Sequence, residues 1–289
     1  MPWTEIGEHA LALGLYPGFV ATLLVGSVLE VAAGWAMVPE RGGPRVAGRA
    51  VLAVLRDTGP RGVPLLSALG VFLALVAVLQ TSAPFNPVPS EDRNVVVAAI
   101  GLAAAGWAGW GWGWGKDEID PGLMLRVQLC WLVAVLVPAL VPENLHPGAL
   151  GVRQLGSYLP IKFACGLLFL ACMPALMQLL PESAPVGVPG AIRPRDGDRD
   201  AAGMEVLRAT LWLPYCGLFA SLFFPPPEDL SGALRFAVAA GGAAALTMAG
   251  AKTLIYQGAV FTRRFYSFAA VPFALVVLGL GTLASLLRV

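Results

Sequence analysis

Eight long apolar stretches constrain this chain more than any other feature of its sequence. A helix of about 20 apolar residues crosses a bilayer core of about 30 Å. Stretches of that length occupy residues 11–38, 62–82, 94–115, 123–142, 157–180, 205–224, 233–255 and 266–287. They predict an all-α polytopic membrane protein with about eight transmembrane helices. We expect a single membrane domain over residues 1–289.

Composition indicates that lipid is the solvent for most of the chain. Hydrophobic residues make up 57% of the sequence and charged residues 13%, whereas a soluble domain carries roughly 25% charged residues. These values exclude a soluble globular enzyme and a disordered chain. The net charge of +1 excludes a nucleic-acid-binding protein that depends on a basic surface.

The basic residues are distributed unequally between the two sides of the predicted helices. Of the 19 lysines and arginines, 14 lie in or beside the loops that follow the first, third, fifth and seventh apolar stretches. Because cytoplasmic loops of membrane proteins are enriched in Lys and Arg, we expect these loops on the cytoplasmic side. Both termini then lie on the outer side of the membrane.

The first cytoplasmic loop contains a predicted short amphipathic helix over residues 45–57. On a helix with about 100° per residue, Arg45, Arg49 and Arg56 fall within an arc of about 40°, and apolar residues cover the other sides. This pattern is typical of an interfacial helix whose arginines face lipid headgroups or the acidic surface of a partner. The alternative is an ordinary basic loop.

Charged residues inside or beside the apolar stretches are candidates for a functional role. Glu30 is predicted about 13 Å inside the membrane, where a carboxylate costs a few kcal/mol unless it is neutral, paired or hydrated. The alternative is a structural carboxyl that is protonated or paired with an arginine. Glu205 and Arg208 lie three residues apart and form a candidate local ion pair. Lys162 is expected to reach the outer surface with its ammonium group.

No metal or nucleophile motif stands out in the sequence. The four cysteines, Cys130, Cys165, Cys172 and Cys216, lie inside apolar stretches without a CxxC pair, and we expect them to be buried thiols. Two histidines alone make a weak case for a metal site. The chain is therefore not expected to be an enzyme on its own.

Short segments spread over most of the chain carry a resemblance to a known family. Leu29-Glu30, followed by Arg41, Gly43-Pro44 and Gly48, is similar to a Leu-Glu-Arg and Gly-Pro pattern at the end of that family's first helix. Residues 184–191 (APVGVPGA) are similar to its Ala-Pro-Phe-Asp-Leu-Pro-Glu-Ala segment. The family that the chain resembles comprises the H-type membrane subunit of respiratory complex I, the NADH-quinone oxidoreductase, and the equivalent subunit of membrane-bound hydrogenases.

Two further segments extend the resemblance. Gly203-Met204 is similar to the family's Tyr-Ser-Gly-Met, and residues 263–266 (RRFY), expected just before the last helix, are similar to its Arg-x-Arg-Tyr-Asp. Eight helices with both termini outside is also the family's topology. The resemblance therefore implies a divergent member.

The chain departs from the family where the family has carboxylates. Gly187 and Gly190 replace an Asp and a Glu, and Leu180, Leu213 and Ser267 stand at or near three further acidic positions. In complex I those carboxylates line the quinone chamber and the start of the proton route. Because proton transfer needs titratable groups or water, their loss predicts that this chain does not pump in the usual way.

The resemblance implies roles for individual residues. Junction or quinone-cavity candidates are Glu30, Arg41, Arg45, Arg49, Pro185 and Pro189. Proton-path candidates are Glu30 and Glu205. Candidates for docking a partner are Arg56, Arg193, Arg195, Arg199, Arg263 and Arg264.

The resemblance also implies partners and a place in the cell. It implies other membrane-arm subunits and soluble hydrogenase-like, iron–sulfur subunits on the cytoplasmic face. Iron–sulfur clusters belong to those partners, a quinone is a candidate ligand, and no covalently bound cofactor or nucleic acid is expected. The location implied is the inner (cytoplasmic) membrane of a bacterium.

Two other functions compete with this interpretation. One is a non-catalytic anchor that keeps the fold and the docking face but has lost quinone and proton chemistry, and the missing carboxylates favour it. The other is a stand-alone secondary transporter. A transporter of that kind often carries an inverted repeat, which we do not find in the sequence.

Overall fold

The computed structural model describes residues 3–37, 49, 65–114, 120–140, 144–152, 158–180 and 199–287. Across these ranges the chain is helical and forms no β-strand. The helices are α1 (Trp3–Gly14), α2 (Phe19–Met37), α4 (Leu65–Leu79), η2 (Ser90–Asp92), α5 (Val95–Trp114), α6 (Pro121–Leu140), α7 (Pro147–Val152), α8 (Leu159–Leu176), α9 (Arg199–Phe223), α10 (Leu230–Gln257), α11 (Ala259–Phe265), η4 (Tyr266–Ala270) and α12 (Val271–Leu287). The predicted all-α class is confirmed.

The apolar helices coincide with the predicted spans. Among the described residues, six helical segments are long and apolar enough to cross a membrane. Two shorter apolar helices, Leu65–Leu79 and Val95–Gly109, fall on the second and third predicted spans. The structure is therefore that of a polytopic membrane protein, because helices of this length satisfy their own backbone hydrogen bonds in lipid.

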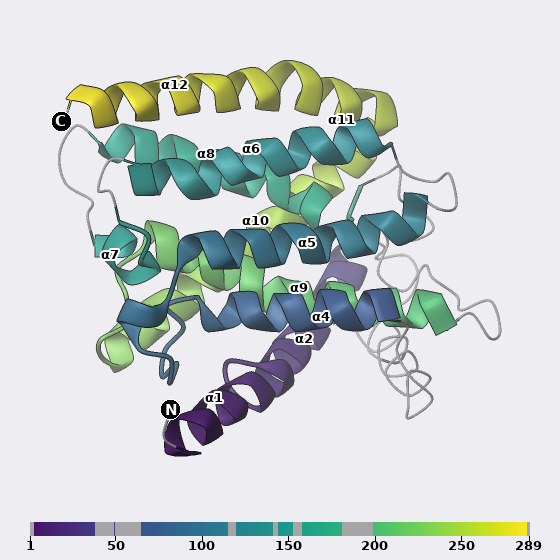
Figure 1. Cartoon of the computed structure of the whole chain (residues 1–289). Helices are drawn as coiled ribbons and strands as arrows, with labels where there is room; N and C mark the ends of the chain where they lie inside the picture. Colours follow the sequence, from purple (N-terminus) through teal and green to yellow (C-terminus); the bar gives the residue numbers. More distant parts are fainter. Residues whose placement is uncertain are drawn as a thin grey trace.

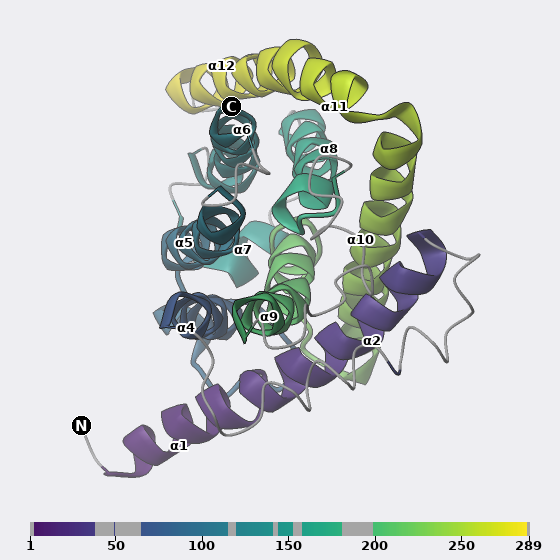
Figure 2. The same cartoon turned by 90° about the vertical axis from the view of Figure 1, so that its right-hand side faces the viewer.

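Helix α9 lies in the middle of the bundle and contacts helices on several sides. Figure 2 shows α4, α5 and α6 in one layer beside α8 and α9, with α10 on the far side of α9. The α11–α12 segment lies over α6 and α8, and α2 crosses α9 obliquely (Figure 2). In α9, 89% of the most apolar stretch is buried in the bundle, whereas in Ala259–Leu287 the share is 22%. Hence α9 is the central helix, and the last helix is peripheral.

The two ends of the bundle differ, and we name them by the helices they carry. The α7 end holds α7, the connection between α4 and α5, and the connection between α9 and α10 (Figure 1). The first and last described residues also lie at this end (Figure 1). The α11 end holds α11, the end of α5 and the start of α6 (Figure 1). Because the first and last described residues lie at the same end, the chain crosses the bundle an even number of times.

The predicted spans 11–38 and 205–224 agree with the apolar segments Ala10–Met37 and Glu205–Phe223. Three helices nevertheless break or extend in ways that the sequence did not predict. The first stretch contains a break between α1 and α2, where Pro17 cannot donate a backbone hydrogen bond. The sixth helix begins at Arg199 rather than at residue 205, so Arg199 lies in α9 and not in a loop. The last helical segment begins at Ala259 after the turn at Gly258, which has φ 84°, so Arg263 and Arg264 are helical.

Lys162 corrects another expectation. Its side chain is buried, and Nζ donates to the carbonyl oxygen of Leu150 at 2.6 Å instead of reaching water. Leu150 lies in the last turn of α7, where backbone carbonyls lack helical partners and attract a cation. Lys162 therefore joins α8 to α7. The four cysteines are buried and free, as expected for the thiols.

Candidate functional site

A buried ion pair joins α2 to α9 through Glu30 and Arg208. The Arg208 guanidinium donates from Nε to Glu30 Oε1 at 3.1 Å and from Nη2 to Glu30 Oε2 at 2.9 Å. The Trp212 indole N–H donates to Glu30 Oε1 at 2.7 Å. Both charged residues are 3% exposed and Trp212 is fully buried. We call these three residues the Glu30 cluster.

A glycine on α2 makes this contact achievable. A Cβ atom at Gly26 would collide with the carbonyl oxygen of Ala209, so only glycine lets the two backbones approach so closely. Gly26 lies one turn before Glu30, and Ala209 follows Arg208 directly. Because residues four apart share one face of a helix, this close crossing brings the carboxylate to the guanidinium.

The Glu30 cluster neutralises its own charges within the bundle. An isolated carboxylate in a low-dielectric interior is strongly unfavourable, whereas a bidentate arginine with an extra donor compensates it. The alternative predicted for Glu30, a structural carboxyl paired with an arginine, thus describes its contacts. The sequence predicts a local pair of Arg208 with Glu205. In the structure Arg208 interacts electrostatically with Glu205, and its guanidinium also donates to Glu30.

Glu205 lies one turn before Arg208 on α9 and completes the charged set. It interacts electrostatically with Arg208 and with Glu30. Its Oε1 atom is buried and has no hydrogen-bond partner within the part of the chain that the structure describes. The arrangement thus combines a tightly bound carboxylate, a guanidinium and a second carboxyl with an oxygen that can accept or carry a proton.

Most of the predicted docking and cavity residues lie outside the described ranges. These are Arg41, Arg45, Arg56, Pro185, Pro189, Arg193 and Arg195. Of the predicted interfacial helix, only Arg49 is described, and it is helical and exposed. Arg199 is the first residue of α9. Arg263 and Arg264 are exposed on α11, at the α11 end of the bundle.

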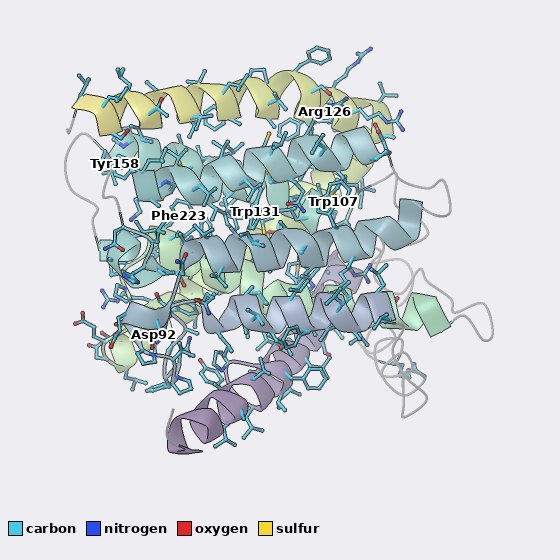
Figure 3. The ribbon with its side chains drawn as sticks, in the orientation of Figure 1. Asp92, Trp107, Arg126, Trp131, Tyr158 and Phe223 are labelled. Atoms are coloured by element: carbon cyan, nitrogen blue, oxygen red, sulfur yellow. The ribbon has the colours of Figure 1, made fainter. Side chains whose placement is uncertain are left out.

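A second arginine contact ties α6 to the last helical segment. Arg126 Nη1 donates to Ser267 Oγ at 3.0 Å, and Figure 3 labels Arg126 on α6 below the start of α12. Ser267 stands where the resembled family has an aspartate. The hydroxyl keeps a hydrogen bond to the arginine without adding a negative charge.

The bundle also has a cavity, but at the other end. A cavity of about 700 Å³ opens at the α7 end, lined by residues that include Ser82, Phe85, Arg93 and His146. None of the predicted site residues lines it. Arg93 is half-buried and its pKa is lowered by desolvation. Its Nε and Nη2 atoms donate to backbone carbonyls of the 86–88 turn, so its role there is to hold the loop.

Sequence reasoning missed two members of the cluster, Trp212 and the true partner of Glu30. A comparison of how far each charged residue lies from the end of its helix would have indicated the partner of Glu30. At 1.5 Å per residue, Glu30 lies about 10 Å from the end of α2 and Arg208 about 14 Å from the start of α9. The predicted helix start at residue 205 concealed this match in depth.

Comparison with known proteins gives a likeness of fold. No protein-family model and no curated protein sequence matches the chain. Its structure is similar to a chain of the membrane-bound sulfane sulfur reductase, an archaeal respiratory membrane complex, with a TM-score of 0.58. The match covers 95% of this chain and 99% of that chain at 12% sequence identity. The two chains share a fold from end to end.

Proposed function

We propose that the chain serves as the H-type membrane subunit of a respiratory complex related to complex I or to energy-converting hydrogenases. The similarity to a chain of an archaeal respiratory membrane complex supports this, because it covers 95% of the present chain and leaves no large part unmatched. The motifs around Glu30 and residues 184–191 point to the same family. In this role the chain holds a soluble redox module at the α11 end.

The observation that carries the proposal is the Glu30 cluster with Glu205 beside it. Charged residues inside a membrane protein are costly and are rare outside functional sites. Here three of them lie together on α2 and α9 within about 10–14 Å of the α11 end. Glu30 stands at the position where the resembled family has the glutamate of its Leu-Glu-Arg motif.

Within this proposal the two carboxyls have different tasks. Glu30 accepts three hydrogen bonds and keeps its negative charge beside Arg208. Glu205 has an oxygen without a donor among the described residues and is therefore the group that exchanges a proton. Glu205 lies beside both charges of the ion pair, so a change in the electric field near the cluster acts on Glu205 as well.

The docking surface of the proposal is basic. Arg263 and Arg264 are exposed at the α11 end, and the sequence predicts that the other basic segments lie on the same side of the membrane as these two residues. A soluble iron–sulfur subunit with an acidic surface would fit such a face. The proposal also includes a quinone site, for which Arg45, Arg49, Pro185 and Pro189 are the candidate lining residues.

The test is Glu205→Gln in the assembled complex, with Glu228→Gln at the exposed α7 end as the matched control. We expect E205Q to leave assembly and electron transfer largely intact and to lower the number of protons moved per electron in sealed vesicles. E228Q should match the unaltered complex. Equal proton-to-electron ratios in E205Q and E228Q would contradict the proton role.

One observation favours a second candidate, the non-catalytic anchor. The hydrogen bonds of Glu30 are those of a structural ion pair, and α5, α6 and α8 contain no acidic residue. The double substitution R263E/R264E tests the docking face that both candidates share, and both predict that it releases the soluble partner. The variant E205Q separates them, because only the anchor predicts that it has no effect.

A further inference from the structure

A pair of polar side chains on α6 lies buried away from the Glu30 cluster. Gln128 is 3% exposed and Trp131 is fully buried. Neither the amide nitrogen nor the amide oxygen of Gln128 has a hydrogen-bond partner in the described part of the chain, and the same holds for the indole N–H of Trp131. Three polar atoms of two neighbouring side chains are thus left without protein partners.

The Gln128 amide and the Trp131 ring both lie near Tyr215, in the region between α5, α6 and α9. Gln128 and Trp131 lie three residues apart and so share one face of α6. Gln128 Nε2 and Tyr215 Oη lie 2.9 Å and 3.5 Å from the point where a Cβ atom of Gly106 would stand. The rings of Trp131 and Tyr215 contact each other edge to face at a centroid distance of 5.4 Å. Figure 3 labels Trp131 in the interior of the bundle.

An unpaired primary amide is expensive at this depth. Gln128 is the eighth residue of α6, about 10 Å along the helix from its first residue. Leaving a buried donor or acceptor unsatisfied costs about 1–3 kcal/mol for each group. Buried waters in proteins satisfy such groups, each typically with about three hydrogen bonds. The two amide atoms, the indole N–H and the Tyr215 hydroxyl supply that number of partners.

We propose that Gln128 and Trp131, with Tyr215, bind internal water inside the bundle, at a site separate from the Glu30 cluster. Gln128 Oε1 accepts from the water, Gln128 Nε2 and Trp131 Nε1 donate to it, and Tyr215 Oη adds a further oxygen. Tyr215 Oη donates its hydrogen to the Leu102 carbonyl at 3.2 Å, so it can act toward a water only as an acceptor. Because α5, α6 and α8 contain no acidic residue, this water is a hydrated point in an otherwise apolar part of the fold. The inference does not depend on the proposed function.

The test is hydroxyl-radical labelling of the full chain in its native membrane, read by mass spectrometry. X-ray pulses generate radicals from water where it is bound, so a buried side chain is oxidised only when water lies beside it. Met124 and Trp131 are the reporters, because both are fully buried and Met124 Cε lies 3.5 Å from the same Gly106 position. Met173 on α8 is equally buried and serves as the internal control.

We expect Met124 and Trp131 to be oxidised well above Met173, and Gln128→Leu to reduce both to the level of Met173. Thermal stability gives a second measurement with a defined sign. If water is bound, Q128L removes its main ligand and leaves the Trp131 N–H unpaired, so the melting temperature falls. If the site is dry, Q128L removes an unsatisfied amide and the melting temperature rises. Labelling of Met124 and Trp131 at the level of Met173 in the unaltered chain would overturn the inference, even if Q128L fails to assemble.

Discussion

Arg208 on α9 holds Glu30 on α2 through two hydrogen bonds, 3.1 Å from Nε to Oε1 and 2.9 Å from Nη2 to Oε2, across 178 residues of sequence. Both side chains are buried, and Trp212 adds a third donor to the carboxylate. This contact fixes the crossing of the most N-terminal long helix against the central helix. Its energetics can be tested directly.

Removal of one charge from this pair should destabilise the protein more than removal of both charges. Glu30→Gln leaves a buried guanidinium without its counter-charge, and Arg208→Gln leaves the carboxylate, so we expect each single variant to lose about 3–5 kcal/mol of stability. The double variant E30Q/R208Q should recover most of that loss. Denaturant or thermal unfolding in detergent measures all three, and strictly additive losses would show that the two groups are not coupled.

In the same variants, assembly of the complex and the coupling of electron transfer to proton movement are measured separately. We expect Glu30→Gln to lower the coupled activity of the complex. If the Glu30 charge is needed for coupling, E30Q/R208Q should assemble normally yet move fewer protons per electron. If the pair is purely structural, the double variant should regain both assembly and coupling.

Gly26 should tolerate no side chain at the α2–α9 crossing. In Gly26→Ala the new methyl group would collide with the Ala209 carbonyl oxygen, so the helices must separate, at a cost of about 1–3 kcal/mol. Separation also lengthens the Glu30–Arg208 contact. Gly279→Ala on α12 is the matched control, because no atom lies within 4 Å of the added carbon. A melting temperature of G26A equal to that of G279A would argue against the close approach.

Lys162 should be required for the position of α7. Lys162→Met keeps the length of the side chain but leaves the Leu150 carbonyl without its 2.6 Å donor, and we expect a loss of about 1–3 kcal/mol. The loss should be local, with faster amide exchange in Pro147–Val152. Lys252→Met, at an exposed position of α10, should leave exchange in α7 unchanged. Unaltered exchange in K162M would mean that α7 is held by other contacts.

The start of α10 should depend on pH through Asp229. The Gly232 N–H and the Ser231 hydroxyl both donate to this carboxylate, and they hold its pKa below the ordinary value of 3.8. A lowered pKa means that the cap is fully present above pH 3.8 and is lost as the pH falls through the lower, folded-state pKa. The protection factors of the amides of residues 230–233, which are corrected for the intrinsic slowing of exchange in acid, should therefore fall as the pH drops.

The matching variants identify the group responsible for this pH dependence. Asp229→Ala should show low protection factors at every pH, because the N-cap acceptor is gone. Asp229→Asn should show slow exchange that no longer depends on acid, since an amide oxygen can cap without titrating. Persistence of the acid response in D229N would assign it to another residue.

Hydropathy and charge were sufficient to predict the membrane fold from the sequence alone. The apolar stretches predicted the helices: six of the eight coincide with described segments long enough to cross a membrane, and the other two coincide with shorter apolar helices. The first and last described residues lie on one side of the bundle. This succeeds because the length and apolarity needed to cross a bilayer are local properties of a segment. The same argument singled out Glu30, since a carboxylate in an apolar stretch is unusual whatever surrounds it.

Only the tertiary structure decided which groups meet. The sequence suggested Glu205 as the neighbour of Arg208, but the rotation of α9 and the close crossing at Gly26 turn Arg208 toward Glu30. Nothing in the sequence distinguishes Gln128. Its lack of hydrogen-bond partners among the described residues depends on what α5 and α9 place beside it. Hydropathy reports how a residue interacts with lipid or water, whereas the choice of partner depends on the distance and rotation between helices that are far apart in the chain.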